Sequence, residues 1–150
     1  MSAEEQQKQD ELFMSKAIEQ ARQALSDGEI PIGAVIVCQG RIIARAHNFT
    51  ETLHDVTAHA EMQAITAAAN QLGGKYLRGC TLYVTVEPCV MCAGALGWSQ
   101  IDRVVYGAPD VKRGYTLYAP HAYHPKTQVT SGVLENACRQ LMQDFFKERR

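Results

Sequence analysis

The chain has 150 residues and a formal net charge of −1, a length that fits one domain with a single core. Hydrophobic residues make up 46% and charged residues 21%, as in ordinary soluble domains, and no apolar run approaches a membrane span. The first ten residues are polar and acidic, unlike a signal or transit peptide, so we expect a cytoplasmic protein.

Five cysteines argue against a complete disulfide framework. The charge argues weakly against a large nucleic-acid surface.

The N-terminal part of the chain predicts a helix followed by a strand hairpin. Apolar residues recur at spacings of three and four over residues 10–26, which indicates an amphipathic helix; they are Met14, Ala17, Ile18, Ala21 and Leu25. We expect residues 1–9 to be a disordered extension. The apolar run 32–38 predicts a strand buried on both faces, and the turn Gln39-Gly40 returns the chain as a second strand over 41–46.

The rest of the chain predicts alternating helices and strands. The alanine-rich run 59–72 ends at two glycines and reads as a helix. Strands are expected at 81–86, 103–106 and 127–130, with a short helix over 89–98 and a terminal helix near 134–145. A strand, helix and strand over 81–106 imply a parallel pair with a right-handed crossover. The fold class is therefore α/β: a five-stranded mixed sheet with helices on both faces.

The residues with the clearest chemistry are Cys89, Cys92, His59 and Glu61. Two thiolates and one imidazole are ligands that Zn²⁺ prefers, and three protein ligands leave the fourth position of a tetrahedral ion open to water, as in catalytic sites. The two cysteines are three residues apart, so on a helix they face the same side. Glu61 supplies a group that can carry protons. We therefore expect one Zn²⁺ held by His59, Cys89 and Cys92, with Glu61 as the catalytic acid and base.

The same four residues also fit a redox protein or a structural zinc module. A Cys-x-x-Cys pair alone is also typical of thioredoxin-like redox proteins, but the second element, His59 with Glu61, is hard to explain as accident. The second alternative is a non-catalytic binding module stabilised by zinc. Glu61 argues against that, because a structural site does not need a proton carrier.

The motifs extend into a resemblance that covers nearly the whole chain. The segments are EIPIGAV (29–35), TAHAE (57–61), LYVTVEPCVMCAGA (82–95), RVVYGA (103–108) and DFF (144–146). They resemble bacterial tRNA-specific adenosine deaminases, within the zinc-dependent cytidine and deoxycytidylate deaminases whose signature is H-x-E with P-C-x-x-C. The resemblance implies a three-layer cytidine-deaminase fold and makes residues 10–150 a single zinc-dependent deaminase domain.

The resemblance also implies a substrate, a partner and further site residues. It implies hydrolysis of the wobble adenosine of a tRNA anticodon loop to inosine, by a homodimer. The small residues Ala93, Gly94, Ala95 and Gly97 would let another element approach closely. The residues that match substrate-contacting positions are Asn48, the backbone N–H groups of Ala60 and Cys89, Asp110 and Phe146. From the residues alone, Asn48 and Asp110 are equally turn residues, and Phe146 fits a core position. Glu87, which precedes Pro88, is a further candidate substrate contact, and its alternative is a solvated carboxylate.

One segment departs from the family pattern. Residues 112–128 lack the family's Gly-Ser and Asn-His-Arg elements and are instead aromatic and basic, a composition that can stack bases and contact phosphates. The alternative is a tyrosine-rich loop that packs on the sheet or at a subunit contact. We group Lys112, Arg113 and Lys126 as candidate phosphate contacts. The departure leaves open the alternative that the substrate is a free nucleobase or nucleoside, of guanine or cytosine type.

Overall fold

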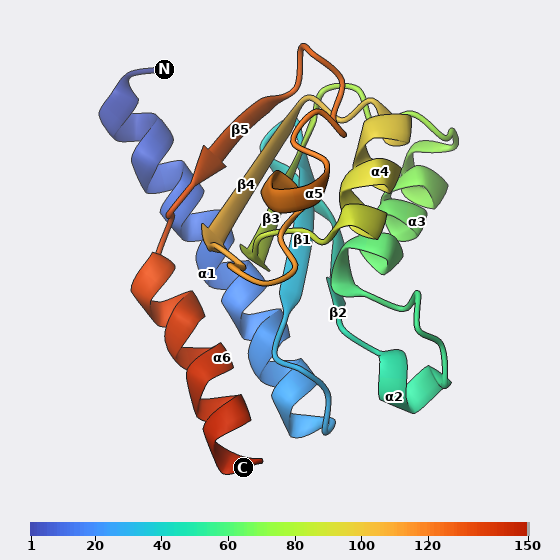
Figure 1. Cartoon of the computed structure of the whole chain (residues 1–150). Helices are drawn as coiled ribbons and strands as arrows, with labels where there is room; N and C mark the ends of the chain where they lie inside the picture. The colour runs from blue at the N-terminus through green and yellow to red at the C-terminus, as the bar shows by residue number, and fades with distance from the viewer. Residues whose placement is uncertain (150) are drawn as a thin grey trace.

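The five strands form one mixed sheet at the centre of the molecule (Figure 1). The computed structural model describes residues 1–149. The spatial order is β2-β1-β3-β4-β5. The strands are β1 (Gly33–Cys38), β2 (Arg41–His47), β3 (Cys80–Val86), β4 (Arg103–Ala108) and β5 (Gln128–Ser131). Strand β1 pairs antiparallel with both β2 and β3, whereas β4 pairs parallel with β3 and β5.

Helices cover both faces of this sheet, which confirms the predicted three-layer architecture (Figure 1). One face carries α1 (Ala3–Ser26) and α6 (Glu135–Glu148), and the other carries α3 (Ala60–Leu72) and α4 (Val90–Ser99). Two one-turn helices, α2 (Thr50–Leu53) and α5 (Tyr115–Tyr118), lie in the connections. No helix within residues 1–149 is long and apolar enough to cross a membrane.

A separate apolar core fills each face of the sheet. On the α1 side, Met14 and Ala17 of the helix pack on Val35, Tyr83 and other strand side chains that face α1. Beneath α3 and α4, the small residues Ala60, Ala64, Ala68 and Ala93 pack against the sheet, together with Leu82, Val84, Leu96 and Val104. Alanine side chains let a helix axis lie close to the strands. The first turns of α3 and α4 are thereby held against the ends of β2 and β3.

The N-terminal helix differs from its prediction. It begins at Ala3, so residues 3–9, expected to belong to a disordered extension, are helical. Ser2 caps the helix by accepting a hydrogen bond from the Glu5 N–H at 3.1 Å, and Glu4 and Glu5 lie in the first turn, where acidic side chains suit the helix dipole. The apolar periodicity starts later than these capping signals, because the first two turns project beyond the sheet.

Candidate active site

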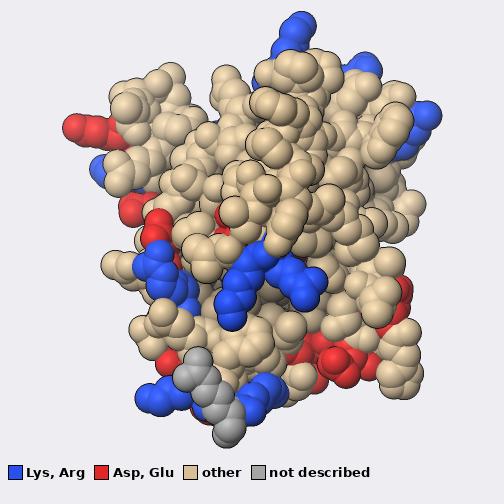
Figure 2. All heavy atoms as spheres, in the orientation of Figure 1, with Lys and Arg blue, Asp and Glu red and all other residues tan. Residues whose placement is uncertain are grey.

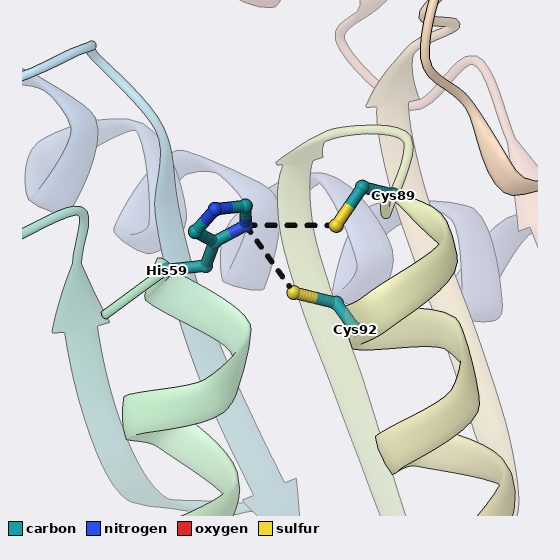
Figure 3. Close-up of side chains that lie close together, drawn as sticks. All are labelled: His59, Cys89 and Cys92. Carbon is teal, nitrogen blue, oxygen red and sulfur yellow. Dashed lines mark hydrogen bonds between the residues drawn. The ribbon is translucent and has the colours of Figure 1, made fainter. Parts of the chain in front are cut away.

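His59 and Cys89 each lie immediately before the first turn of a helix, on either side of one gap (Figure 3). The Nδ1 atom of His59 lies 3.6 Å from Cys89 Sγ and 3.5 Å from Cys92 Sγ. The three ligand atoms all lie within 4.8 Å of one another. A tetrahedral zinc with bonds of about 2.0 Å to nitrogen and about 2.3 Å to sulfur has a nitrogen-to-sulfur edge of about 3.5 Å. The spacing therefore fits one zinc ion.

Glu61 lies beside this cluster, two residues into α3, and only 4% of its side chain is exposed. Burial raises the pKa of its carboxyl to about 7, because the charged form loses its hydration. The negative charge of Cys89 also raises this pKa, and His59 lowers it. A carboxyl group with a pKa near neutrality can both accept and return a proton, which is the property a general acid and base requires.

The two thiols differ strongly in acidity. The hydrogen bond from Cys92 lowers the pKa of Cys89 to about 4 against the effect of burial, and His59 lowers it further. The same hydrogen bond raises the pKa of Cys92, and burial adds to that rise. Cys89 also raises the pKa of His59 through their hydrogen bond. The cluster thus already holds one thiolate without a metal, and full zinc ligation requires Cys92 to lose its proton.

Asn48 lies at the end of β2 and is held by a buried carboxylate that sequence reasoning missed. Its amide Nδ2 donates to Glu29 Oε1 and to Thr50 Oγ1, each at 3.3 Å. Glu29 also accepts from the N–H groups of Glu51 and Thr52 and from the Thr52 hydroxyl. Burial by itself raises the pKa of Glu29, but the hydrogen bonds from Thr52 and its neighbours lower it overall. Glu29 therefore stays charged and fixes both Asn48 and the α2 turn.

Glu87 and Asp110 shape the loop that follows β4, beside the donor cluster of His59, Cys89 and Cys92. Glu87 is buried and accepts hydrogen bonds from the Asp110 N–H and from the N–H and hydroxyl of Thr116. Asp110 Oδ1 in turn accepts from the N–H groups of Lys112 and Arg113. These bonds occupy both carboxylates with protein donors. Their visible role is to shape the loop, and direct contact with substrate stays a prediction for both.

Backbone contacts join this loop to Cys89 of the donor cluster. Gly114 forms an isolated bridge with Cys89, and the Tyr115 N–H donates to the Pro88 carbonyl at 2.9 Å. A methyl group at Gly114 would lie 2.2 Å from Glu87 Oε2. Only glycine allows this approach, so the third residue of the segment 112–128 lies in fixed contact with the site.

The aromatic residues of that segment divide between core and surface. Tyr115 is buried, and its ring lies 4.6 Å from that of Tyr123, which packs on the same core cluster. Tyr118 is 67% exposed, and its hydroxyl donates to the Lys112 carbonyl. Two of these tyrosines therefore pack on the sheet, and Tyr118 is the one available to stack on a base.

The basic residues of the segment lie at two different ends of the sheet. Lys112 and Arg113 follow β4, whereas Lys126 precedes β5 and lines a hollow with Arg78 and Gln100 at the start of β4. At about 3.3 Å per residue the six residues of β4 span about 20 Å. Figure 2 shows basic side chains near the middle of the face in view and others scattered around its edges. The three residues do not form one surface.

Two further predicted residues lie as follows. Ala60 is in the first turn of α3, where backbone N–H groups lack partners within the helix and remain available to a ligand. Phe146 is 47% exposed on α6 and meets Phe145 edge to face. Because α6 covers the sheet face opposite α3 and α4, a contact of Phe146 with substrate stays a prediction.

Known proteins share both the motifs and this architecture. Residues 7–108 match the family described as "Cytidine and deoxycytidylate deaminase zinc-binding region". The chain belongs to this family. It is 48% identical to the tRNA-specific adenosine deaminase of Bacillus subtilis (strain 168) over 147 residues, which is 95% of this chain and 91% of that protein.

Solved structures of the family give the same fold. One, from a study of A-to-I editing by tRNA:A34 deaminases at the wobble position of transfer RNA, has a TM-score of 0.81 and 43% identity, and the match covers 86% of this chain and 97% of that one. A guanine deaminase from Nitrosomonas europaea has a TM-score of 0.80 at 25% identity, with 90% and 83% of the two chains covered. The resemblance inferred from the sequence motifs is thus confirmed.

Proposed function

We propose that this protein is a zinc-dependent hydrolytic deaminase that converts the wobble adenosine of a tRNA anticodon loop to inosine. The observation that carries the proposal is the three-donor cluster of His59, Cys89 and Cys92 beside the buried carboxyl of Glu61. The relatives that are 43–48% identical over nearly all of the chain are tRNA-specific adenosine deaminases, which supports tRNA as the substrate.

The donor set fits zinc in type, number and spacing. Two sulfurs and one imidazole nitrogen at edges of 3.5 and 3.6 Å leave room for one small tetrahedral ion. When bound, zinc lowers the pKa of a water ligand to about 7 and so makes a nucleophile available near neutral pH. Two thiolates and a neutral histidine balance its charge. We therefore assign one Zn²⁺ per chain to these residues.

Glu61 carries the protons of the reaction. Its carboxylate takes a proton from the attacking water and delivers it to N1 of the adenine ring as the water oxygen adds to C6. It then transfers the second proton to the amino group, which leaves C6 as ammonia, so adenosine and water give inosine and ammonia. Burial raises the pKa of this carboxyl, which helps it hold a proton between the two transfers.

Asn48 and the helix termini would hold the nucleotide. With its Nδ2 directed at Glu29 and Thr50, Asn48 can present its Oδ1 to a donor on the base or sugar. The free N–H of Ala60 and the N–H of Cys89 supply donors at the ends of α3 and α4. Glu87 and Asp110 support the loop that closes this side, and Phe146 would stack on a neighbouring nucleotide.

An anticodon loop suits a site of this kind. A single-stranded loop can splay a base into a pocket at modest energetic cost. On the segment that the Gly114 bridge joins to Cys89, Lys112, Arg113 and Tyr118 are exposed, and they would supply charge and one stacking surface to the incoming loop. A local basic group of this size is compatible with a net charge of −1.

Deamination of a free base is the second candidate. The similarity to a guanine deaminase at a TM-score of 0.80 and the near-neutral charge favour it, and zinc and Glu61 would serve that reaction equally well. An assay decides between them: the zinc-loaded protein is incubated with transcribed tRNA and, separately, with free bases and nucleosides. Inosine in the tRNA supports the first proposal; ammonia from free guanine or cytosine alone would replace it with the second.

We also propose that the enzyme is one deaminase domain over residues 10–150, a homodimer, and cytoplasmic. The dimer is supported by the outer face of α4, where Trp98 is 86% exposed beside Val90 and the small residues Gly94 and Gly97. These residues line a hollow of about 560 Å³. A second copy would cover this apolar surface.

A further inference from the structure

Cys38 and Cys80 lie directly opposite each other in the sheet, and the proposed reaction uses neither. Cys38 ends β1 and Cys80 begins β3, and the two are register partners in the antiparallel pair. Opposed residues on antiparallel strands project to the same face of the sheet. Both thiols are free.

The backbone spacing of such a pair suits a disulfide. Directly opposed Cα atoms in an antiparallel ladder are about 4.5 or 5.5 Å apart, depending on the hydrogen-bonding position, and disulfides join Cα atoms about 4.4–6.8 Å apart. A bond would therefore need side-chain rotation and little movement of the strands. We propose that Cys38 and Cys80 are a redox-active pair that forms a reversible disulfide on exposure to a hydroperoxide.

The two thiols would react in a fixed order. Cys38 is partly exposed, whereas Cys80 is fully buried, so the oxidant meets Cys38 first. The Cys38 thiolate attacks the outer oxygen of the hydroperoxide, which breaks the O–O bond, gives a sulfenic acid and releases an alcohol. Cys80 then attacks the Cys38 sulfur and expels water. Two thiols are oxidised by two electrons and the peroxide is reduced, and a dithiol reductant reverses the change.

The attack of Cys80 on the Cys38 sulfur is the slower of the two steps. Burial and the adjacent Cys38 together raise the pKa of Cys80 to about 12. Because the thiolate is the attacking form, ring closure is slow at neutral pH and accelerates as the pH rises.

The bond would close a loop that carries half of the candidate active site. The chain between Cys38 and Cys80 contains β2, Asn48, His59 and Glu61. A cross-link at the base of this loop restricts the unfolded chain, and a loop of this length raises Tm by about 10 °C. The inference stands independently of which substrate is deaminated.

The test uses the zinc-loaded full chain, in which metal binding protects Cys89 and Cys92. The protein is treated with tert-butyl hydroperoxide at two pH values, then digested without reduction and analysed by mass spectrometry. We expect a linked peptide pair containing Cys38 and Cys80, loss of two hydrogen atoms from the intact mass, faster formation at the higher pH, a raised Tm, and full reversal by dithiothreitol.

The variants Cys38→Ser and Cys80→Ser should show no link, whereas the matched control Cys138→Ser should behave like the parent, since Cys138 packs against β4 away from this pair. The proposal is overturned if Cys38 is oxidised to a sulfinic acid without linkage, or if the linked peptides contain other cysteines. Loss of deaminase activity in every sample bears on the proposed function alone, because linkage is read from mass.

Discussion

Glu61 is buried, its carboxyl has a pKa of about 7, and it lies beside the donor cluster of His59, Cys89 and Cys92. The substitution Glu61→Gln keeps the shape of the side chain but removes its ability to carry protons. We predict that kcat falls by about 10²–10⁴-fold, while the zinc content and circular dichroism stay unchanged. Activity and elemental analysis check this. An exposed control, Glu19→Gln on α1, should retain parental activity; a fully active Glu61→Gln enzyme would remove Glu61 from the mechanism.

At this scale the sequence was informative where chemistry is local and silent where it is not. The types and spacing of His59, Cys89 and Cys92 indicate a metal on their own. The role of Glu29 could not be predicted, because its partners at 48–52 reach it only after the β1–β2 hairpin returns. Glu87 and Asp110 were predicted as substrate contacts, but their hydrogen bonds depend on where the loop after β4 folds back.

Between elements, Asp10 joins α1 to the sheet. Its carboxylate accepts two hydrogen bonds from Arg103, at 2.7 Å each, and one from the Tyr83 hydroxyl at 2.8 Å. Asp10→Asn leaves the largely buried Arg103 without its counter-charge. We predict a loss of about 3 kcal/mol in the free energy of unfolding at pH 7, measured by denaturant titration.

The same pair predicts a dependence of stability on pH. Burial alone would raise the pKa of Asp10, but hydrogen bonds from Arg103 and Tyr83 bring it below the ordinary value of 3.8. A carboxyl with a depressed pKa stabilises the fold fully above its unfolded pKa, and the contribution is lost as the pH falls through the folded value. The parent should therefore lose more stability than Asp10→Asn between pH 7 and pH 3; equal losses would contradict this.

The contact between α1 and β1 gives a third prediction. A methyl group at Gly33 would lie 2.1 Å from the Ala17 carbonyl oxygen and 2.4 Å from the Ala21 nitrogen. Gly33→Ala should force the helix away from the strand and cost about 3 kcal/mol, seen as a lower Tm. Gly74→Ala is the matched control, because nothing lies within 4 Å of the added methyl, and its Tm should change little.

Sequence patterns located every long helix and strand but not the two short helices. Periodicity needs several turns to register, and α2 and α5 have four residues each. The turn of α2 is held by Glu29 and that of α5 by Glu87, so distant carboxylates define both. The start of α1 was also placed too late, since its first turns have capping residues but few apolar ones.

At the scale of the whole molecule, basic residues lie at both ends of the sheet. We expect the RNA to contact those at the end that carries the donor cluster. We predict that replacing Lys112 and Arg113 with Ala raises KM for tRNA and reduces the slope of affinity against salt by about 0.7 per lost phosphate contact. Lys126→Ala is the control at the opposite end and should leave both unchanged. Equal effects at the two ends would mean that the RNA spans the sheet. Activity on free bases should not respond to either change.

The proposed dimer depends on the outer face of α4. Trp98→Glu places a charge on the exposed apolar surface around Val90 and Gly94 and should convert a dimer into monomers at micromolar concentration. Sedimentation velocity measures the outcome, with Leu12→Glu, on an exposed position of α1, as a control that should stay dimeric. A parent protein that sediments as a monomer would contradict the proposed assembly.

The backbone bridge between Gly114 and Cys89 fixes one end of the divergent segment beside the donor cluster. The Tyr115 N–H bond to the Pro88 carbonyl holds the next residue in place as well, and neither backbone contact depends on the side chains that follow. Substitutions at exposed positions such as Leu117 and Tyr118 can therefore alter which molecule enters without moving the proposed ligands. A lineage could exchange one nucleobase-containing substrate for another through this segment while its catalytic centre stayed intact.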